Sequence, residues 1–459
     1  LAGDGIYQPD SWSPDGRAVL VVRADSNTNQ DLFLCDARTG ESRHLTPHEG
    51  EVKFEPGPWR PDGGGFYLLS DQGREFMGLA RCDPRDGALQ WVETPEWDVT
   101  GVAASPDGRY LAWVVNEDGY SRLYVRDGAT DGARAVRDYP DLPRGVYTTL
   151  RFSPAGPLLG LYIARPVRPA DVYLLDVTTG DYRRLTQSFL GGIPEEELVE
   201  PELVRYPTFD GRQIPAWLYR PRDLAPGARA PVVLSIHGGP EYQELPTYAY
   251  GGFYQYLLNR GIGVLAPNIR GSTGYGAAYQ NLIHRDWGGD ELRDLEHAAR
   301  YLRGLPWVDP DRLGVYGGSF GGFATLSCVT RLPEYWAAAV DLVGPANLVT
   351  FAGSVPPFWR RAMKELMGDP DEDAAMLRER SPLTYVDAVR APLLVIQGAN
   401  DPRVAKAESD QMVERLRALG RTVEYMVFED EGHGFTKPAN WLTALRAAAA
   451  WFERYLQPA

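Results

Sequence analysis

The chain has 459 residues, of which 47 are basic and 62 are acidic, giving a net charge of −15 at pH 7. This acidic balance, without any basic cluster, argues against a nucleic-acid or anionic-membrane partner. No apolar run approaches the roughly 18 residues of a membrane-spanning helix, and the cysteines are too few and too scattered for a disulfide framework. We therefore expect a cytoplasmic protein. A secreted or periplasmic location is the alternative, because the sequence starts at Leu1 and a signal segment could have been removed.

A turn motif of the type Ser-Pro-Asp-Gly recurs in the first 190 residues. Its four copies begin at Ser13, Arg60, Ser105 and Ser153. The prolines are spaced by 47, 45 and 48 residues, and a strand-like apolar run follows each copy. A second turn glycine stands 26 residues after each proline, at Gly40, Gly87, Gly132 and Gly180. Repeats of this length with a fixed internal offset are typical of propeller blades, so we expect an all-β propeller of four visible blades over residues 1–190.

Four blades are about the minimum for a closed propeller, and only 12 residues precede the first turn motif. We therefore expect that upstream blades are missing from this chain. A small or open propeller is the alternative. Both arrangements leave strand edges that favour association, so we also consider a homo-oligomer.

The character of the sequence changes near residue 190. Residues 191–202 are polar and contain prolines, which predicts a linker. Residues 203–207 and 213–219 predict an antiparallel hairpin, after which strand and helix patterns alternate up to a final helix at about 441–455. We expect residues 203–459 to form one α/β domain.

The segment Arg312–Gly322 combines a short apolar strand with Gly-Gly-Ser-Phe-Gly, and a helix-compatible run follows. In a nucleophile elbow, glycines leave room for a sharp turn from strand to helix, and the serine projects from that turn. The pattern therefore predicts a serine hydrolase with the α/β-hydrolase fold and Ser319 as its nucleophile. A buried serine in an ordinary turn is the alternative.

In α/β-hydrolases the acid and the base follow the nucleophile along the chain. Asp401 comes after the apolar strand at 392–398, and His433 comes after the strand at 423–428. No other histidine follows Ser319, so His433 is the predicted base. Three other aspartates in this interval do not follow a strand and are interpreted as helix caps or surface charges: Asp369, Asp371 and Asp387. The remaining histidines lack metal-ligand spacing, so we expect no metal site.

Acyl transfer also requires two backbone N–H groups that stabilise an oxyanion. One normally belongs to the residue after the nucleophile, here Phe320, and the other to the loop after the third strand of the sheet. The strand at 231–236 opens into His237-Gly-Gly-Pro240, where the glycines let backbone amides face a cavity. Beside a nucleophile elbow, this loop is interpreted as the source of the second donor. A plain Gly-Gly-Pro turn is the alternative.

Six ordered motifs resemble the prolyl oligopeptidase family of serine peptidases, and within it most of all the acylaminoacyl-peptidase branch. They span about residues 195 to 457 and comprise His237–Pro240, Asn268–Gly276, Asp286–Asp290, Gly317–Gly322, Asn400–Val404 and Gly432–Phe435. The resemblance implies a peptidase that hydrolyses short peptides through an acyl-enzyme on Ser319. It implies no cofactor, and a propeller that screens the active site.

The resemblance also implies two further roles. In acylaminoacyl peptidases the second glycine of the His-Gly-Gly-Pro motif donates to the oxyanion, which is Gly239 here. In prolyl oligopeptidases the arginine two residues after the acid binds a substrate carbonyl, which is Arg403 here; a surface charge is the alternative. The aromatic residues Phe351, Phe358 and Trp359 are candidates for lining the pocket next to the scissile bond, with ordinary packing between domains as the alternative.

Two other functions remain open from the sequence. A carboxylesterase of the same fold would use the same triad. A propeller binding protein with a vestigial hydrolase domain would leave Ser319 inert. The presence of all three triad residues and of a propeller favours the peptidase.

Overall fold

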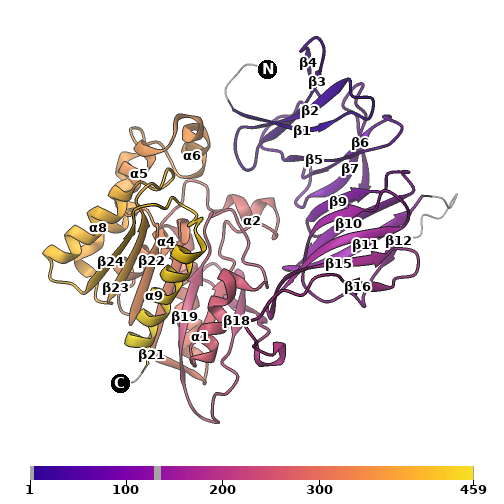
Figure 1. Ribbon diagram of the computed structural model, residues 1–459. Coiled ribbons are helices and arrows are strands. Elements are labelled where there is room, and N and C mark those ends of the chain that lie inside the picture. Colours follow the sequence, from indigo (N-terminus) through magenta and orange to yellow (C-terminus); the bar gives the residue numbers. More distant parts are fainter. Residues whose placement is uncertain (1–4, 129–135, 458–459) are drawn as a thin grey trace. The chain divides into compact units, whose positions relative to one another are not determined.

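The computed structural model of the protein describes residues 5–128 and 136–457. Its internal contacts divide the chain into two compact units (Figure 1). The first unit runs to Glu195 and also includes Leu245–Tyr248 and Thr273–Ala278. The second unit contains the other residues from Glu196 onward. Two short stretches from the C-terminal part of the chain therefore pack with the first unit.

Four antiparallel sheets form the first unit, and each consists of four consecutive strands in chain order. The first two sheets contain β1 (Ile6–Trp12), β2 (Ala18–Ala24), β3 (Gln30–Asp36), β4 (Ser42–His44), β5 (Phe54–Trp59), β6 (Phe66–Ser70), β7 (Gly78–Cys82) and β8 (Leu89–Glu93). The other two contain β9 (Val99–Ala104), β10 (Tyr110–Glu117), β11 (Tyr120–Asp127), β12 (Val136–Asp138), β13 (Val146–Phe152), β14 (Leu158–Arg165), β15 (Arg168–Asp176) and β16 (Tyr182–Arg184). The four predicted blades are confirmed, although Gly132 of the third blade lies outside the described residues.

The repeated turn motif connects the first and second strands of each blade. In the first blade Asp15 Oδ1 accepts hydrogen bonds from the Ser13 hydroxyl at 2.7 Å and from the Arg17 N–H at 3.1 Å. Gly16 completes the turn with a φ of 69°. The same hydrogen bonds recur in the third blade. The turn itself therefore explains two residue types of the motif. The aspartate side chain accepts hydrogen bonds from nearby groups of the turn, and glycine adopts a positive φ without strain.

Apolar side chains fill the spaces between successive blades. Leu20, Phe54 and Phe66 are fully buried in the core shared by the first and second blades. Among the described residues, extensive contacts join the first sheet to the second, the second to the third, and the third to the fourth. The four blades therefore pack against one another in chain order.

An eight-stranded sheet forms the centre of the second unit, in the order β17-β18-β20-β19-β21-β22-β23-β24. Its strands are β17 (Glu202–Pro207), β18 (Gln213–Tyr219), β19 (Ala230–Ile236), β20 (Gly263–Pro267), β21 (Val308–Gly318), β22 (Ala338–Leu342), β23 (Leu393–Gly398) and β24 (Val423–Phe428). The pairs β17–β18 and β18–β20 are antiparallel, and the others are parallel. All residues of β19, β20, β22 and β23 are buried, as in parallel strands that are covered on both faces.

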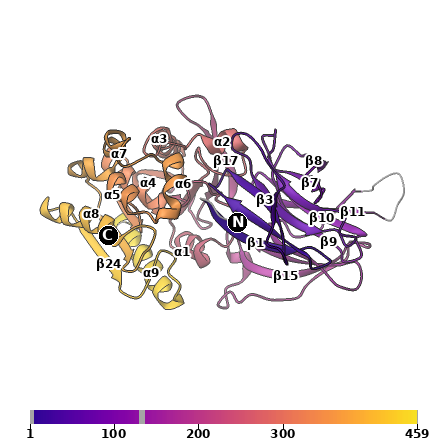
Figure 2. The ribbon, with the colours of Figure 1, turned by 90° about the horizontal axis from the view of Figure 1, so that it is seen from above.

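Helices cover both faces of this sheet (Figure 2). The α-helices are α1 (Phe253–Asn259), α2 (Ala277–Asn281), α3 (Asp290–Gly304), α4 (Phe320–Arg331), α5 (Leu348–Ser354), α6 (Arg360–Leu366), α7 (Ala374–Arg380), α8 (Lys406–Ala418) and α9 (Pro438–Leu456). α1 and α9 contact each other on one face, and α3 and α4 contact each other on the opposite face. None of the helices in the described part of the chain has the length and apolarity needed to cross a membrane.

Candidate active site

Ser319 lies on the turn between β21 and α4, with φ 60° and ψ −120°. This conformation is unfavourable for a residue with a Cβ, and the packing of the turn maintains it. A Cβ on Gly317 would lie 2.2 Å from the carbonyl oxygen of Gly321, and one on Gly321 would lie 2.1 Å from that of Ile236. The Ser319 N–H donates to the Leu342 carbonyl at 2.9 Å, which anchors the turn to β22. The structure therefore has the backbone of the predicted elbow.

The three predicted triad side chains form one continuous hydrogen-bonded chain. His433 Nε2 lies 2.9 Å from Ser319 Oγ, and His433 Nδ1 lies 2.7 Å from Asp401 Oδ2. The Asp401 side chain has no exposed surface, and the His433 side chain is 13% exposed. A buried carboxylate on Nδ1 fixes the imidazole tautomer that leaves Nε2 free to accept the serine proton.

Asp401 divides its oxygens between the loop and the histidine. Oδ1 accepts hydrogen bonds from the N–H groups of Arg403 at 2.8 Å and Val404 at 3.0 Å. Oδ2 therefore stays available for His433. The loop begins where β23 ends, so the strand and these two hydrogen bonds together orient the carboxylate.

The three rival aspartates lie in other surroundings. Asp369 accepts from the N–H groups of Asp371 and Glu372, and also pairs with Lys364. Asp371 and Asp387 are both exposed, and Asp387 pairs with Arg415 at 3.1 Å. These contacts are those of a turn cap and of surface ion pairs.

The His237–Pro240 loop lies beside the nucleophile. A Cβ on Gly238 would be 3.5 Å from the Ser319 Cβ, so the loop backbone passes close to the elbow. His237 is buried, which lowers its pKa to about 4 and keeps the ring neutral. Its Nδ1 lies 2.7 Å from the Gly238 carbonyl, which can only accept, so Nδ1 carries the proton and Nε2 faces the Ser272 hydroxyl at 2.9 Å. The ring thus holds the loop through its neutral tautomer.

Two residues beside the predicted oxyanion donors were not assigned a role from the sequence. Glu241 follows the loop, and its Oε1 accepts from Gln280 Nε2 and His284 Nε2, both at 2.9 Å. Trp287 packs edge-on against Phe320 with the ring centroids 4.8 Å apart. Phe320 is the first residue of α4, so its N–H is one of the four at a helix start without an intrahelical acceptor. The sequence motif at 286–290 draws attention to Trp287, but it does not indicate that the ring packs against Phe320.

The loop that carries Trp287 contains a buried acid. Glu291 accepts hydrogen bonds from the N–H groups of Gly288 at 2.5 Å and Gly289 at 2.8 Å. Burial raises the pKa of Glu291 to about 8, and these hydrogen bonds oppose the rise. Arg380 donates to the Gly288 carbonyl at 2.8 Å from the other side. The loop is therefore held on both of its backbone faces.

The predicted substrate contacts fall into two groups. Phe351 is buried in the core of the second unit and stacks on Trp287, so it packs inside that unit. Arg403 and Phe358 are exposed. The Arg403 guanidinium lies 5.4 Å from the centre of the half-buried Trp359 ring, at the end of the short 3-10 helix Pro357–Trp359. The Arg403 and Trp359 side chains therefore contact each other, whereas the Phe351 ring lies in the hydrophobic core.

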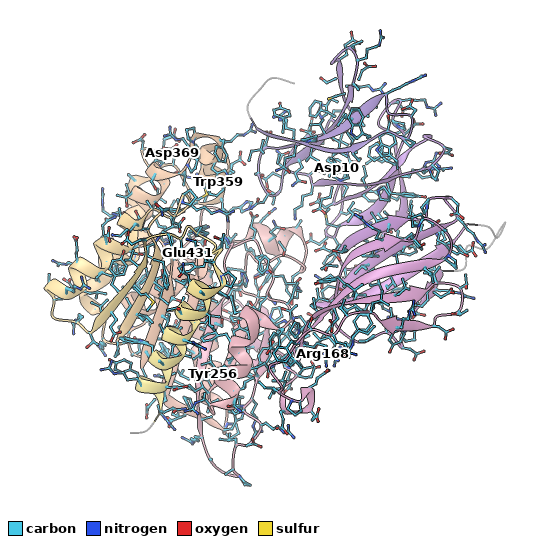
Figure 3. The ribbon with its side chains drawn as sticks, viewed as in Figure 1. Asp10, Arg168, Tyr256, Trp359, Asp369 and Glu431 are labelled. Atoms are coloured by element: carbon cyan, nitrogen blue, oxygen red, sulfur yellow. The ribbon has the colours of Figure 1, made fainter. Side chains whose placement is uncertain are left out.

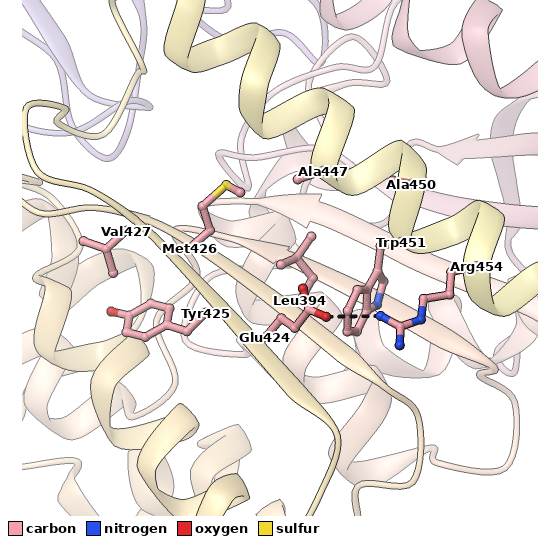
Figure 4. A pocket seen from close by; sticks show the side chains of 9 residues that line it. All are labelled: Leu394, Glu424, Tyr425, Met426, Val427, Ala447, Ala450, Trp451 and Arg454. Carbon is pink, nitrogen blue, oxygen red and sulfur yellow. Dashed lines mark hydrogen bonds and ion pairs between the residues drawn. The ribbon is translucent and has the colours of Figure 1, made fainter.

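A cavity of about 480 Å³ between β24 and α9 lies away from these residues (Figure 4). It is lined by Leu394, Glu424, Tyr425, Met426, Val427, Ala447, Ala450, Trp451 and Arg454. No triad residue is among them. Within residues 5–128 and 136–457, no group of three or more histidine, cysteine or acidic side chains is arranged to hold a metal ion.

Residues 249–459 match the prolyl oligopeptidase family, over the segment that holds the whole triad. The chain resembles that family over this segment. It is 43% identical to dipeptidyl aminopeptidase BIII of Pseudoxanthomonas mexicana over 242 residues, which are 50% of this chain and 35% of that protein. It is 27% identical to the acylamino-acid-releasing enzyme of Arabidopsis thaliana over 234 residues, 49% of this chain and 30% of that one.

A solved structure matches nearly the whole chain. The puromycin-hydrolyzing peptidase of Mycobacterium tuberculosis superposes with a TM-score of 0.89 at 27% identity, over 99% of this chain and 70% of that one. The predicted combination of a propeller with an α/β-hydrolase domain is therefore confirmed. The chain spans about a third of the length of the two curated relatives named above.

Proposed function

We propose that this protein is a serine peptidase that hydrolyses short peptides through an acyl-enzyme on Ser319. The observation that carries this proposal is the unbroken contact from Ser319 Oγ through the His433 ring to Asp401, at 2.9 and 2.7 Å. The family match and the peptidase names of the relatives support a peptide as the substrate.

In the proposed mechanism His433 Nε2 takes the Ser319 proton as Oγ attacks the scissile carbonyl carbon. Asp401 stabilises the imidazolium that forms, and the N–H groups of Gly239 and Phe320 bind the oxyanion. His433 then gives its proton to the leaving nitrogen, so the C–N bond breaks and an ester on Ser319 remains. Water, deprotonated by His433, attacks that ester and releases the carboxylic acid.

Arg403 is the proposed contact for a carbonyl of the substrate backbone. Its guanidinium is exposed, lies over the Trp359 ring and carries five N–H donors in a fixed plane. The ring restricts the positions that this long side chain can take, which reduces the entropy lost when a peptide binds. A carbonyl or carboxylate next to the triad suits this arrangement.

The amino terminus of the substrate separates two candidate activities. We propose an acylaminoacyl-peptidase or oligopeptidase type, as the motifs of the sequence imply. A dipeptidyl aminopeptidase is the second candidate, because the relative that shares 43% identity bears that name. The first would cleave peptides with a blocked amino terminus, and the second would require a free one.

A matched substrate panel tests these proposals. Purified protein and its Ser319→Ala variant would be assayed with the same short peptide in free-amino, N-acetylated and C-terminally blocked forms, beside a p-nitrophenyl ester. We expect cleavage of the acetylated peptide by the parent and none by the variant. Cleavage of the free-amino form alone would favour the dipeptidyl aminopeptidase. Ester turnover without peptide cleavage would leave a carboxylesterase, and no Ser319-dependent turnover would refute a catalytic role.

A further inference from the structure

The loop that carries His433 is fixed at both ends by one buried acid, Glu431. This residue, labelled in Figure 3, stands between the end of β24 and the histidine. It is 1% exposed, although Glu429, two residues before it, is exposed. An acidic side chain is rarely buried to this extent unless its oxygens are bonded.

Four donors converge on the Glu431 carboxylate, and all come from the start of α9 and the residues before it. Oε2 accepts from the Thr436 N–H at 2.8 Å and from its hydroxyl at 3.4 Å. Oε1 accepts from the Lys437 N–H at 3.0 Å and from Asn440 Nδ2 at 2.8 Å. Burial would raise the pKa of Glu431, but the bonds from Asn440 and the two N–H groups outweigh it and lower the pKa. The acid therefore lies as an anion beside the start of α9, a position that the helix dipole favours.

The backbone of Glu431 binds the loop of the triad acid. Its carbonyl accepts the Asn400 N–H at 2.9 Å, directly before Asp401. The fit beneath this contact is close, because a Cβ on Gly398 would lie 2.4 Å from the Gly432 carbonyl oxygen. One residue thus links the loop of Asp401 to the loop of His433 and, through its side chain, to α9.

His433 lies between these two fixed points, in the stretch from Glu431 to Thr436. Phe435, within this stretch, has a φ of 47°. Its ring packs edge-on against that of Phe428, with the ring centroids 5.1 Å apart. Proton transfer requires that His433 Nε2 stay within hydrogen-bond reach of Ser319 Oγ. A shift of the loop backbone changes this distance directly.

We propose that Glu431 is a positioning residue whose carboxylate holds the His433 loop in the geometry required for proton transfer. The inference rests on the proposed function, in which His433 is the base. Glu431 makes none of its recorded contacts with the triad side chains, so it acts through the backbone that carries them.

Because all four partners of Glu431 are hydrogen-bond donors, substitution by glutamine tests whether the carboxylate is required. Glu431→Gln keeps the size of the side chain, but it replaces one acceptor oxygen with an NH₂ group that faces donors. A side chain that only filled space would tolerate this change. A carboxylate that must accept four hydrogen bonds would not, and at least one end of the stretch would be released.

Two control variants separate positioning from general effects. Glu429→Gln makes the same chemical change two residues away, where the carboxylate has no hydrogen bond or ion pair to the described residues. Ala450→Gly places a helix-destabilising residue on the exposed face of α9. It lowers the stability of the same helix without touching the His433 loop.

The experiment measures how fast a fluorophosphonate probe labels Ser319, together with kcat and KM for the p-nitrophenyl ester. For Glu431→Gln we expect labelling and kcat to fall by about 10- to 100-fold, with KM within about twofold of the parent. Glu429→Gln should match the parent, and Ala450→Gly should do so even where its melting temperature is lower. Asn440→Ala removes one of the four donors and should cause a smaller fall in the same direction.

The outcomes distinguish the role of Glu431 from the catalytic role of Ser319. A Glu431→Gln variant that labels at the parent rate would overturn the inference, and so would an equal loss in Ala450→Gly. If Glu431→Gln does not fold, an Asn440→Ala variant with unchanged kcat would overturn it instead. A parent protein that is not labelled at all would refute the proposed function.

Discussion

At the scale of the residue, the two oxygens of Asp401 have different partners, and a one-atom change tests the importance of that division. Asp401→Asn keeps the shape but places an NH₂ group either against the Arg403 and Val404 N–H groups or against His433. We expect the second, which holds the wrong imidazole tautomer and lowers kcat by about 10⁴-fold. Steady-state ester kinetics check this. Asp387→Asn, on the surface, serves as the control, and similar losses in both variants would contradict the assignment.

Glu244 predicts a pH dependence of stability that is separate from catalysis. It is buried, and burial raises its pKa to about 7 from 4.5, against the hydrogen bond from Tyr254. Between these values the folded protein retains a proton that the unfolded chain has released, so this contribution is complete below pH 4.5 and is lost as the pH rises through about 7.

The expected size of this loss is about 3 kcal/mol of unfolding free energy, since each pKa unit corresponds to about 1.4 kcal/mol. Glu244→Gln should remove that part of the pH dependence, because the amide oxygen still accepts from Tyr254 and carries no proton equilibrium. Urea unfolding of both proteins at several pH values across this window measures the difference. Parallel curves for the two proteins would refute the prediction.

The residues that could be predicted from the sequence are those with a local signature. Ser319 is marked by the glycines around it, and Asp401 and His433 each follow an apolar strand. Glu431 has no such signature, because its role depends on donors that only the folded loop brings together. Phe351 illustrates the reverse. Its place in an aromatic stretch between the elbow and the acid suggests a pocket, but its ring lies in the core.

At the scale of the element, the elbow predicts effects of very different size for two of its glycines. A Cβ on Gly318 would have its nearest neighbour, Leu342, at 3.5 Å, whereas one on Gly321 would lie 2.1 Å from a backbone oxygen of Ile236. We expect Gly318→Ala to change stability by less than about 1 kcal/mol and Gly321→Ala to cost more than about 3 kcal/mol. Thermal unfolding of both variants measures this. Equal melting temperatures would show that the turn can relax.

Strands with continuous apolar runs were the most predictable elements. The predicted strand at 423–428 is β24 (Val423–Phe428) itself, and the predicted strand at 392–398 differs from β23 by one residue. β21 extends further toward the N-terminus than the apolar run, because Asp309 and Pro310 interrupt the pattern without ending the strand. α9 begins at Pro438, where a proline suits the first helical turn, and not at the first apolar residue.

At the scale of the whole molecule, sequence continuity and spatial grouping differ, and Glu75 tests the difference. Thr273–Ala278 belongs to the first unit by its contacts. There the Glu75 carboxylate accepts the Ala278 N–H at 2.8 Å, and Trp97 packs edge-on against Tyr275. We expect Glu75→Ala to speed limited proteolysis within Thr273–Ala278 by about tenfold, as the loss of a charged hydrogen bond implies.

Mass-spectrometric mapping of the early cleavage sites measures that rate. Glu96→Ala, an exposed acid in the same unit, should leave the rate unchanged. Equal cleavage in both variants would mean that other contacts hold the segment. Such a grouping was not predictable from the sequence, because the propeller repeats and the hydrolase motifs each suggest an unbroken domain.

The spacing of the triad along the chain has a consequence during synthesis. Each blade is made of four consecutive strands, so a blade can pair as soon as it has left the ribosome. The central β19 instead lies between two strands that are made after it, and His433 emerges 114 residues after Ser319. The nascent chain therefore carries paired blades well before it carries all three residues of the proposed triad, so this triad can be completed only late in translation.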